Sequence, residues 1–182
     1  GAARAVAQSV AYEIPLLLSV LAVAFQVGSL DLAAIAASQT QGLLSWNVLV
    51  QPLAFIIFFI SGIAETNRAP FDLPEAETEL VAGFHSEYSS MKFAMFFMAE
   101  YANMATAAAM ATTLFLGGPS GPFGPSPVWF VGKVFALLFI FIWFRATLPR
   151  FRYDQLMTFG WKRLLPLALA NAAVTAILVA VL

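Results

Sequence analysis

The fold is decided by uncharged apolar runs, and the clearest of them reads LLPLALANAAVTAILVAVL (Leu164–Leu182). A helix that crosses a bilayer core about 30 Å thick needs roughly 20 apolar residues, and this run supplies them without a charge. Lipid offers the backbone no hydrogen-bond partners, so a spanning run of this kind is helical. The run therefore predicts a transmembrane helix.

Similar runs occur along the rest of the chain. The chain is 61% hydrophobic and 10% charged, whereas soluble domains average about 25% charged residues. We predict an all-α, polytopic transmembrane helix bundle of about five spans, with short amphipathic or loop helices, as one membrane domain over residues 1–182. The predicted spans cover residues 9–28, 48–64, 93–116, 128–144 and 164–182.

Two connections between these spans are distinctive. Residues 30–41 (LDLAAIAASQTQ) are too polar and too short to span, and they predict a short helix along the membrane surface. Residues 117–127 (GGPSGPFGPSP) hold four glycines and four prolines, which predicts a tight, uncharged loop without helix or strand.

The basic residues predict an orientation, because Lys and Arg gather on the cytoplasmic side of membrane proteins. Connections 28–47 and 117–127 contain no Lys or Arg, which places them outside. Lys133 is the exception, and it lies near the outer end of its span, where its long side chain can reach outward. The residues that follow the rule are Arg4, Arg68, Lys92, Arg145, Arg150, Arg152, Lys162 and Arg163.

The cytoplasmic connection 65–92 concentrates acidic residues. Charge runs usually mark solvated faces, and Asp72-Leu73-Pro74-Glu75 has the pattern of a capped helix start, which predicts a short helix over 73–83. A second interpretation is that crowded carboxylates titrate as a coupled set and exchange protons with a redox group nearby. The pattern leaves both open. Six of the chain's ten acids lie here: Glu65, Asp72, Glu75, Glu77, Glu79 and Glu87.

Two acids lie inside predicted spans, where a charge costs roughly 2.5–3.5 kcal/mol and is usually functional. Glu13 follows Arg4 by nine residues and Glu100 follows Lys92 by eight, so both would lie roughly 12–13 Å from the cytoplasmic edge. Each is adjacent to a tyrosine, Tyr12 or Tyr101. We predict that they form one layer, either as a proton relay or as hydrogen-bonding groups between helices.

Composition also excludes several kinds of site. The chain has no cysteine and one histidine, which excludes a cysteine-ligated iron–sulfur cluster or zinc–thiolate site and disfavours any metal site in this chain. The net charge of -1 argues against nucleic acid as a partner. The chain begins with Gly1 and without a signal peptide, and we expect it to be part of a longer protein.

The stretch ETNRAPFDLPEAETELVAGFHSEYSSMKFAMFFMAEY (Glu65–Tyr101) resembles the signature region of the NADH-quinone oxidoreductase subunit 1 family. This family forms the membrane heel of respiratory complex I. RAVAQSVAYEIPL (Arg4–Leu16) and ATLPRFRYDQLMTFGWK (Ala146–Lys162) resemble two further motifs of the family. The resemblance covers essentially the whole chain, and the N-terminal part of the family, with its first membrane helices, has no counterpart here.

The resemblance implies a subunit of the proton-translocating NADH:quinone oxidoreductase in a prokaryotic inner (plasma) membrane. Such a subunit helps to form the chamber for the substrate quinone, ubiquinone or another, and couples its reduction in electron transport to proton transport. It holds no complete active site, catalytic residue, metal or iron–sulfur cluster of its own. The implied partners are peripheral quinone-site subunits, antiporter-like membrane subunits and the lipid bilayer.

The resemblance also implies roles for residues. The quinone-side loop would contain Glu65, Arg68, Phe71, Asp72, Glu75, Glu77, Glu79 and Glu87. The proton path would contain Glu13, Tyr12, Glu100 and Tyr101.

Two alternatives remain. The membrane subunit of an energy-converting hydrogenase shares the theme PFD-x-x-EAE-x-EL but needs no quinone, and FHSEYS (Phe84–Ser89) is more similar to the quinone enzymes. A passive membrane anchor for peripheral redox subunits would need the connection 65–92 for assembly alone. A freestanding transporter is disfavoured, since no inverted repeat is visible.

Overall fold

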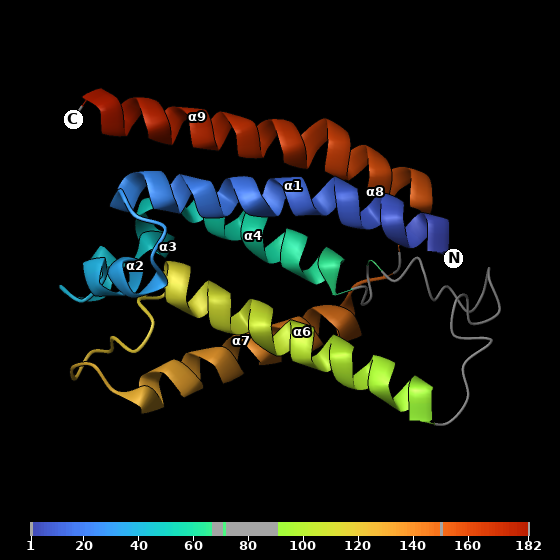
Figure 1. Cartoon of the computed structure of the whole chain (residues 1–182), viewed down its shortest axis with the longest axis horizontal. Helices are drawn as coiled ribbons and strands as arrows, with labels where there is room; N and C mark the ends of the chain where they lie inside the picture. Colours follow the sequence, from blue (N-terminus) through green and yellow to red (C-terminus); the bar gives the residue numbers. More distant parts are fainter. Residues whose placement is uncertain (1, 67–70, 72–90, 150, 182) are drawn as a thin grey trace.

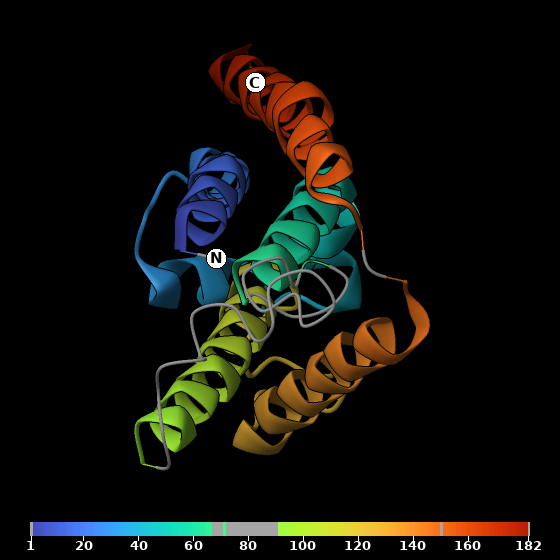
Figure 2. The ribbon, with the colours of Figure 1, turned by 90° about the vertical axis from the view of Figure 1, so that its right-hand side faces the viewer.

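The computed structural model describes residues 2–66, 71, 91–149 and 151–181, and the regular structure within them is helical. The long helices are α1 (Ala2–Val27), α4 (Pro52–Glu65), α6 (Met91–Phe115), α7 (Pro127–Thr147) and α9 (Leu165–Val181). They pack in the order α9, α1, α4, α6, α7, each against the next, so that α9 and α7 lie at opposite ends of the stack (Figures 1 and 2).

The ends of the helices gather on two sides of the molecule. In Figure 1 the N-terminus and the starts of α6 and α8 (Tyr153–Phe159) lie on the right. The left side holds α2 (Leu32–Ser38), α3 (Asn47–Val50) and the C-terminus. The helices thus alternate in direction as the basic residues predict, and we name the right side cytoplasmic and the left side external on that rule.

Several helices have the length and composition of transmembrane segments. Among the described residues, Val6–Val27, Pro127–Thr147 and Tyr153–Val181 are long and apolar enough to cross a membrane. The all-α membrane bundle predicted from the sequence is therefore confirmed. Helix α6 has 25 residues but falls outside this set because it is less apolar. The count of five spans stays a prediction.

The predicted span 48–64 differs from the structure, which breaks it in two. Helix α3 ends at Val50, Gln51 has φ −129° and ψ 64°, and α4 begins at Pro52. The proline ring disfavours a helical conformation in the residue before it, while proline itself is well placed in a first helical turn. The remaining helix has 14 residues, or about 21 Å, which is less than the bilayer core.

The other differences concern helix ends. Helix α1 begins at Ala2 rather than near residue 9, because its first turns are rich in alanine, the best helix former. Residues 153–181 form one continuous helical segment, in which a π-helix (Gly160–Leu164) joins α8 to α9. The predicted surface helix within 30–41 is α2, capped by the Asp31 carboxylate, which accepts from the Ala33 N–H. The helix predicted over 73–83 lies outside the described residues.

Aromatic rings join α4 to its neighbours on the external and central parts of the bundle. The rings of Phe55 and Phe115 are 5.4 Å apart, and those of Phe59 and Phe141 are 4.7 Å apart. Such tilted and edge-on pairs add about 0.5–1.5 kcal/mol each beyond the area that they bury. Small residues serve the α1–α9 contact instead: Ala168, Ala172 and Thr175 are the buried residues of α9.

Candidate functional site

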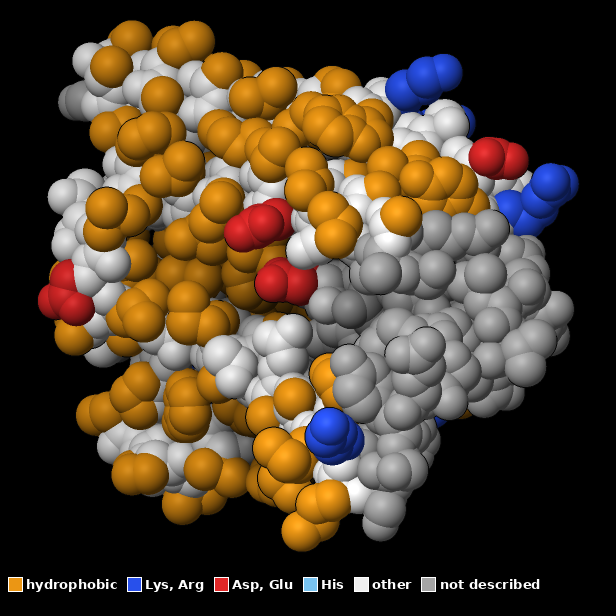
Figure 3. All heavy atoms as spheres, turned by 45° about the vertical axis from the view of Figure 1, so that its right-hand side comes forward, with side chains coloured by type: hydrophobic (Ala, Val, Ile, Leu, Met, Phe, Trp, Pro, Cys, Tyr) orange, Lys and Arg blue, Asp and Glu red, His pale blue; other side chains and the backbone are white. Residues whose placement is uncertain are grey.

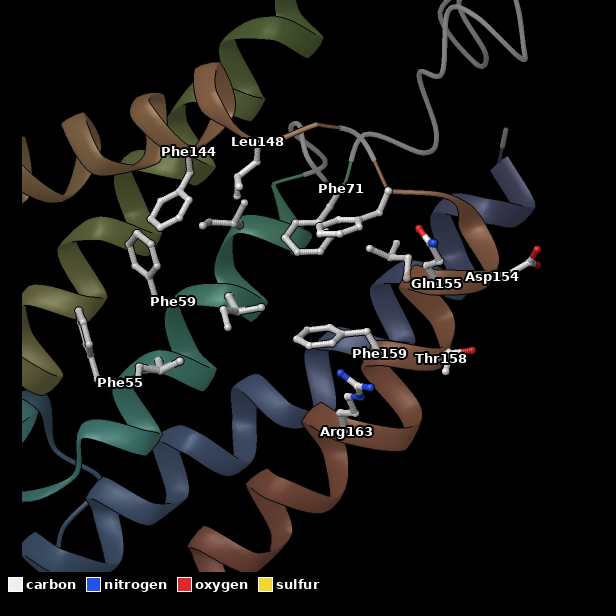
Figure 4. Close-up of a pocket in the computed structure, with 15 residues that line it drawn as sticks. Phe55, Phe59, Phe71, Phe144, Leu148, Asp154, Gln155, Thr158, Phe159 and Arg163 are labelled. Carbon is white, nitrogen blue, oxygen red and sulfur yellow. The ribbon is translucent and has the colours of Figure 1, made fainter.

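A cavity of about 860 Å³ opens near the cytoplasmic side of the bundle, between α4, the end of α7, and α8. Its wall is mostly apolar, and each of these segments contributes phenylalanine rings to it (Figure 4). Figure 4 shows Phe59 and Phe144 facing each other, and their ring centroids are 5.9 Å apart. The aromatic residues that line the cavity are Phe55, Phe59, Phe71, Phe144, Phe151 and Phe159.

Polar side chains are restricted to the α8 side of this cavity. They are Asp154, Gln155, Thr158 and Arg163. Figure 4 shows Arg163 beneath the ring of Phe159, whereas Asp154 points away from the middle of the group. The cavity thus combines a long apolar wall with a few hydrogen-bonding groups, which is the usual composition of a small-molecule site. It suits a flat, mainly apolar ligand with polar atoms at one part.

Phe71 connects this cavity to the acidic connection predicted from the sequence. Its side chain is buried, and its ring lies 5.6 Å from the ring of Tyr12 and 5.8 Å from that of Phe151. One ring belongs to α1 and the other to the segment before α8. The residue that precedes Asp72 in sequence is therefore fixed in the core and forms part of the cavity wall.

Two polar side chains of α1 bind the surrounding backbone. The amide of Gln8 donates to the carbonyl oxygens of Ala64, at 2.7 Å, and Phe71, at 2.8 Å. One turn later, the hydroxyl of Tyr12 donates to the carbonyl of Leu156 at 2.9 Å. Both side chains are fully buried. They join α1, the end of α4, Phe71 and α8 at one point.

Of the predicted acids, Glu13 and Glu65 interact. Burial and, after it, the charge of Glu13 raise the pKa of the Glu65 carboxyl group, and both side chains keep exposed surface. Figure 3 shows acidic side chains next to one another within a face that is otherwise largely hydrophobic. Both effects favour the protonated form of Glu65.

Glu13 and Glu100 lie on helices that have different main packing partners. Helix α1 packs mainly on α4 and α9, and α6 packs mainly on α7, α4 and α2. Glu100 is partly buried and Tyr101 is half-exposed. A common layer of Glu13 and Glu100 stays a prediction.

Most residues predicted for the quinone-side loop fall outside the described residues. These are Arg68, Asp72, Glu75, Glu77, Glu79 and Glu87. Within the described residues, no group of three or more His, Cys, Asp or Glu side chains is placed to hold a metal ion.

The external end holds a polar network that the sequence did not predict. The amide of buried Gln39 donates to the carbonyls of Ile35, Thr113 and Leu114, and its oxygen accepts from the N–H groups of Asn47 and Gly117. Lys133 reaches outward as expected, but its ammonium binds the carbonyls of Leu116, Gly118 and Ser120. The same ammonium lies 4.2 Å from the centre of the Trp46 ring, within the range of a cation–π contact.

The sequence analysis named Phe71 and Tyr12 but missed several other residues that build the site. The motif 146–162 indicated the family but did not indicate where its side chains lie in the fold. Within it or just after it are Phe151, Phe159 and Arg163. Gln8 is an amide in a largely apolar helix, and its spacing of four residues from Tyr12 is the signal that places both on one face.

Comparison with known proteins agrees with the resemblance. A model of the family described as NADH dehydrogenase matches residues 1–176. The chain is 59% identical over 192 residues to an NADH-quinone oxidoreductase subunit of Koribacter versatilis, which covers 99% of this chain and 54% of that protein. It is 57% identical over 180 residues to an NADH-quinone oxidoreductase subunit of Geobacter sulfurreducens, with 98% of this chain and 51% of that protein covered.

A third relative shows the same pattern. An NADH-quinone oxidoreductase subunit of Bacillus cytotoxicus is 52% identical over 182 residues, which covers 98% of this chain and 54% of that protein. All three relatives are the subunits designated H of their enzymes. The chain thus spans about half the length of the curated relatives that it matches. Since the family match extends over nearly the whole chain, the chain belongs to the NADH dehydrogenase family.

Proposed function

We propose that this chain is part of the membrane subunit of a proton-translocating NADH:quinone oxidoreductase, in which it helps to form the quinone chamber and couples quinone reduction to proton translocation. The chain carries no complete active site. Electrons come from a redox centre in a peripheral partner subunit, and the other partners are antiporter-like membrane subunits. Its relatives are bacterial, which favours a prokaryotic inner membrane.

The cavity supports quinone as the ligand. A quinone has a flat ring with polar carbonyl oxygens and a long apolar tail. Ligand pockets commonly measure about 300–1,000 Å³ and bury most of a ligand in apolar surface, and this cavity of about 860 Å³ falls within that range. The aromatic wall suits the ring and tail, and the Arg163 and Gln155 side chains supply donors for carbonyl oxygens.

One observation carries the proposal: Phe71 belongs both to the cavity wall and to the beginning of the acidic connection. A quinone becomes a quinol when it takes up electrons and then protons at its carbonyl oxygens. The carboxylates that follow Phe71 in sequence would respond to this demand for protons. The Glu13–Glu65 pair lies on the same side of the bundle and can pass the change in charge onward.

The exposed acids also support membrane partners. An acid inside a transmembrane bundle normally faces protein or a hydrated cavity rather than lipid. Glu13 lies within the candidate span Val6–Val27 and is exposed on the described surface. We therefore expect this face to be covered by another protein segment in the assembled enzyme, as antiporter-like subunits would cover it.

The quinone site is tested by narrowing the cavity. Phe59→Trp adds volume to the cavity wall and is expected to raise the KM for a short-chain quinone about tenfold in the assembled complex, since overpacking commonly costs about 1–3 kcal/mol. Phe139→Trp is the matched control, because Phe139 lies on α7, is 66% exposed and does not line the cavity. Steady-state kinetics in membranes provide the measurement.

Equal KM values in Phe59→Trp and in the wild-type protein would place the quinone elsewhere. If Phe59→Trp and Phe139→Trp both reduced the amount of assembled complex but left its quinone turnover normal, the result would favour a passive membrane anchor for peripheral redox subunits. The co-purifying subunits give an independent check, since a nickel-containing partner would identify a hydrogenase.

A further inference from the structure

Gln8 is a buried amide that donates two hydrogen bonds to backbone far along the chain. Its nitrogen donates to the carbonyls of Ala64 and Phe71, which are 56 and 63 residues away in sequence. The side chain has no exposed surface. Removing a partner from a buried hydrogen bond leaves the other group desolvated and costs about 1–3 kcal/mol, so these bonds constrain the two segments strongly.

The two bonds act on different segments that must meet at one place. Ala64 lies near the end of α4, and Phe71 lies in the connection that follows it. A single side chain of α1 therefore fixes the distance between the end of this helix and the backbone at Phe71. Tyr12, one turn later on the same face of α1, contacts the ring of Phe71. The backbone and the ring of Phe71 are thus held by neighbouring residues of α1.

Gln8 stands outside the cavity that Phe71 lines. Among the described residues, the cavity wall includes Phe71 but not Gln8. An effect of Gln8 on a ligand in the cavity must therefore pass through the position of Phe71. A glutamine side chain does not titrate, so it is not itself a proton carrier.

We propose that Gln8 is a positioning residue that sets the place of Phe71 and, through it, the shape of the cavity at the start of the acidic connection. The inference rests on the proposed function, because the ligand in the cavity is taken to be a quinone. It goes beyond that function in assigning the control of quinone affinity to a side chain that does not touch the ligand.

The test compares Gln8→Leu and Gln8→Asn with wild type in the full assembled complex. Gln8→Leu removes both donors and is expected to raise the KM for a short-chain quinone about tenfold while kcat changes less than about twofold, on the scale of one lost buried hydrogen bond. Gln8→Asn keeps the amide on a shorter side chain, and a rise of about threefold is expected because one bond is retained. If Gln8→Leu does not assemble, Gln8→Asn alone decides.

Gln26→Leu is the matched control. Gln26 lies on α1 as well, and its amide donates to the Asn47 side chain at 3.2 Å near the external end. Its loss weakens the same helix without touching Phe71, and the quinone KM is expected to stay at the wild-type value. An equal rise in KM in Gln26→Leu would show a general weakening of α1 and would overturn the inference.

A measurement that does not involve quinone separates this inference from the proposed function. Hydrogen exchange of the assembled complex is expected to be faster in Gln8→Leu for a peptide that contains Phe71, and unchanged in Gln26→Leu. Unchanged exchange in Gln8→Leu would overturn the positioning role whatever the quinone kinetics show. A wild-type complex that reduces no quinone would overturn the proposed function, while the exchange data would still report on Gln8.

Discussion

The two ends of the bundle are built in opposite ways. At the external end, Gln39, Asn47 and Lys133 bind the carbonyls at the end of α6 and in the loop after it. At the cytoplasmic end, a cavity lies open, burial and the charge of Glu13 raise the pKa of Glu65, and a helix contains a π-turn. Both ends hold buried polar groups, but they use them differently.

The difference separates a fixed end from a responsive one. Networks of buried hydrogen bonds make an arrangement rigid when their members are satisfied, which suits an end that only closes the bundle. Neighbouring acidic side chains and an open cavity do not fix one arrangement of the cytoplasmic end. This end can therefore change when a ligand or a proton binds. We therefore expect substitutions at the external end to change stability and substitutions at the cytoplasmic end to change function.

The largest effect is expected from Gln39→Leu. This change leaves the N–H groups of Asn47 and Gly117 without their acceptor, and breaking a buried network of this kind costs about 4 kcal/mol. Chemical unfolding in detergent measures the loss. Gln41→Leu, on an exposed neighbour, should change the free energy of unfolding by less than about 0.5 kcal/mol. Similar values for the two variants would mean that the external end is not specially stabilised.

A smaller effect, on function alone, is expected from neutralising the acid pair. Glu13→Gln and Glu65→Gln each remove a carboxyl group from the proposed proton path, and we expect about tenfold slower proton pumping, or about 1.4 kcal/mol in the barrier. Dye-reported pumping in reconstituted vesicles measures this, and Glu100→Gln tests the third acid in the same assay.

The control for these variants is Asp31→Asn at the external end. Asp31 is an exposed cap of α2, and asparagine caps a helix about equally well, so pumping should stay normal. Full pumping with normal quinone turnover in both Glu13→Gln and Glu65→Gln would remove the pair from the proton path.

The smallest effect is expected from Tyr12→Phe. The hydroxyl donates to the Leu156 carbonyl, and its loss should lower the free energy of unfolding by about 1 kcal/mol. Pumping should fall less than in Glu13→Gln, because this proton is held by the backbone. A pumping defect as large as that of Glu13→Gln would make Tyr12 a member of the proton relay. It would also weaken the distinction between polar groups that fix the packing of helices and acids that exchange protons.

The fold was largely readable from the sequence because its signals are local. Uncharged runs, the Gly- and Pro-rich segment 117–127 and the one-sided basic residues each report on their own surroundings. The break at Gln51–Pro52 was missed because the span was predicted from the number of apolar residues in the run. That number takes no account of the proline ring, which restricts the backbone of the residue before it. The π-helix gave no signal that periodicity can detect.

The site was less readable because its contacts are distant in sequence. Resemblance singled out Tyr12, Glu13, Glu65 and Phe71, but the Gln8–Phe71 bond joins residues 63 apart and depends on how α1 packs on α4. The layer of Glu13 and Glu100, inferred from depth alone, stays a prediction, and the structure adds an electrostatic effect of Glu13 on Glu65. The sequence gives the depth of a side chain in the membrane, but its neighbours also depend on how the helices pack.

The π-helix between α8 and α9 has a consequence for helical phase. Each residue added to a helix turns everything after it by about 100°, and a π-turn accommodates an extra residue without ending the helix. One face of α8 points toward the cavity and one face of α9 points toward α1. In an uninterrupted α-helix of the same sequence, these two faces would have a different angle between them. If this segment became a regular helix without losing a residue, Ala168, Ala172 and Thr175 would rotate away from α1, whereas deleting one residue within Gly160–Leu164 would let a regular helix keep them there.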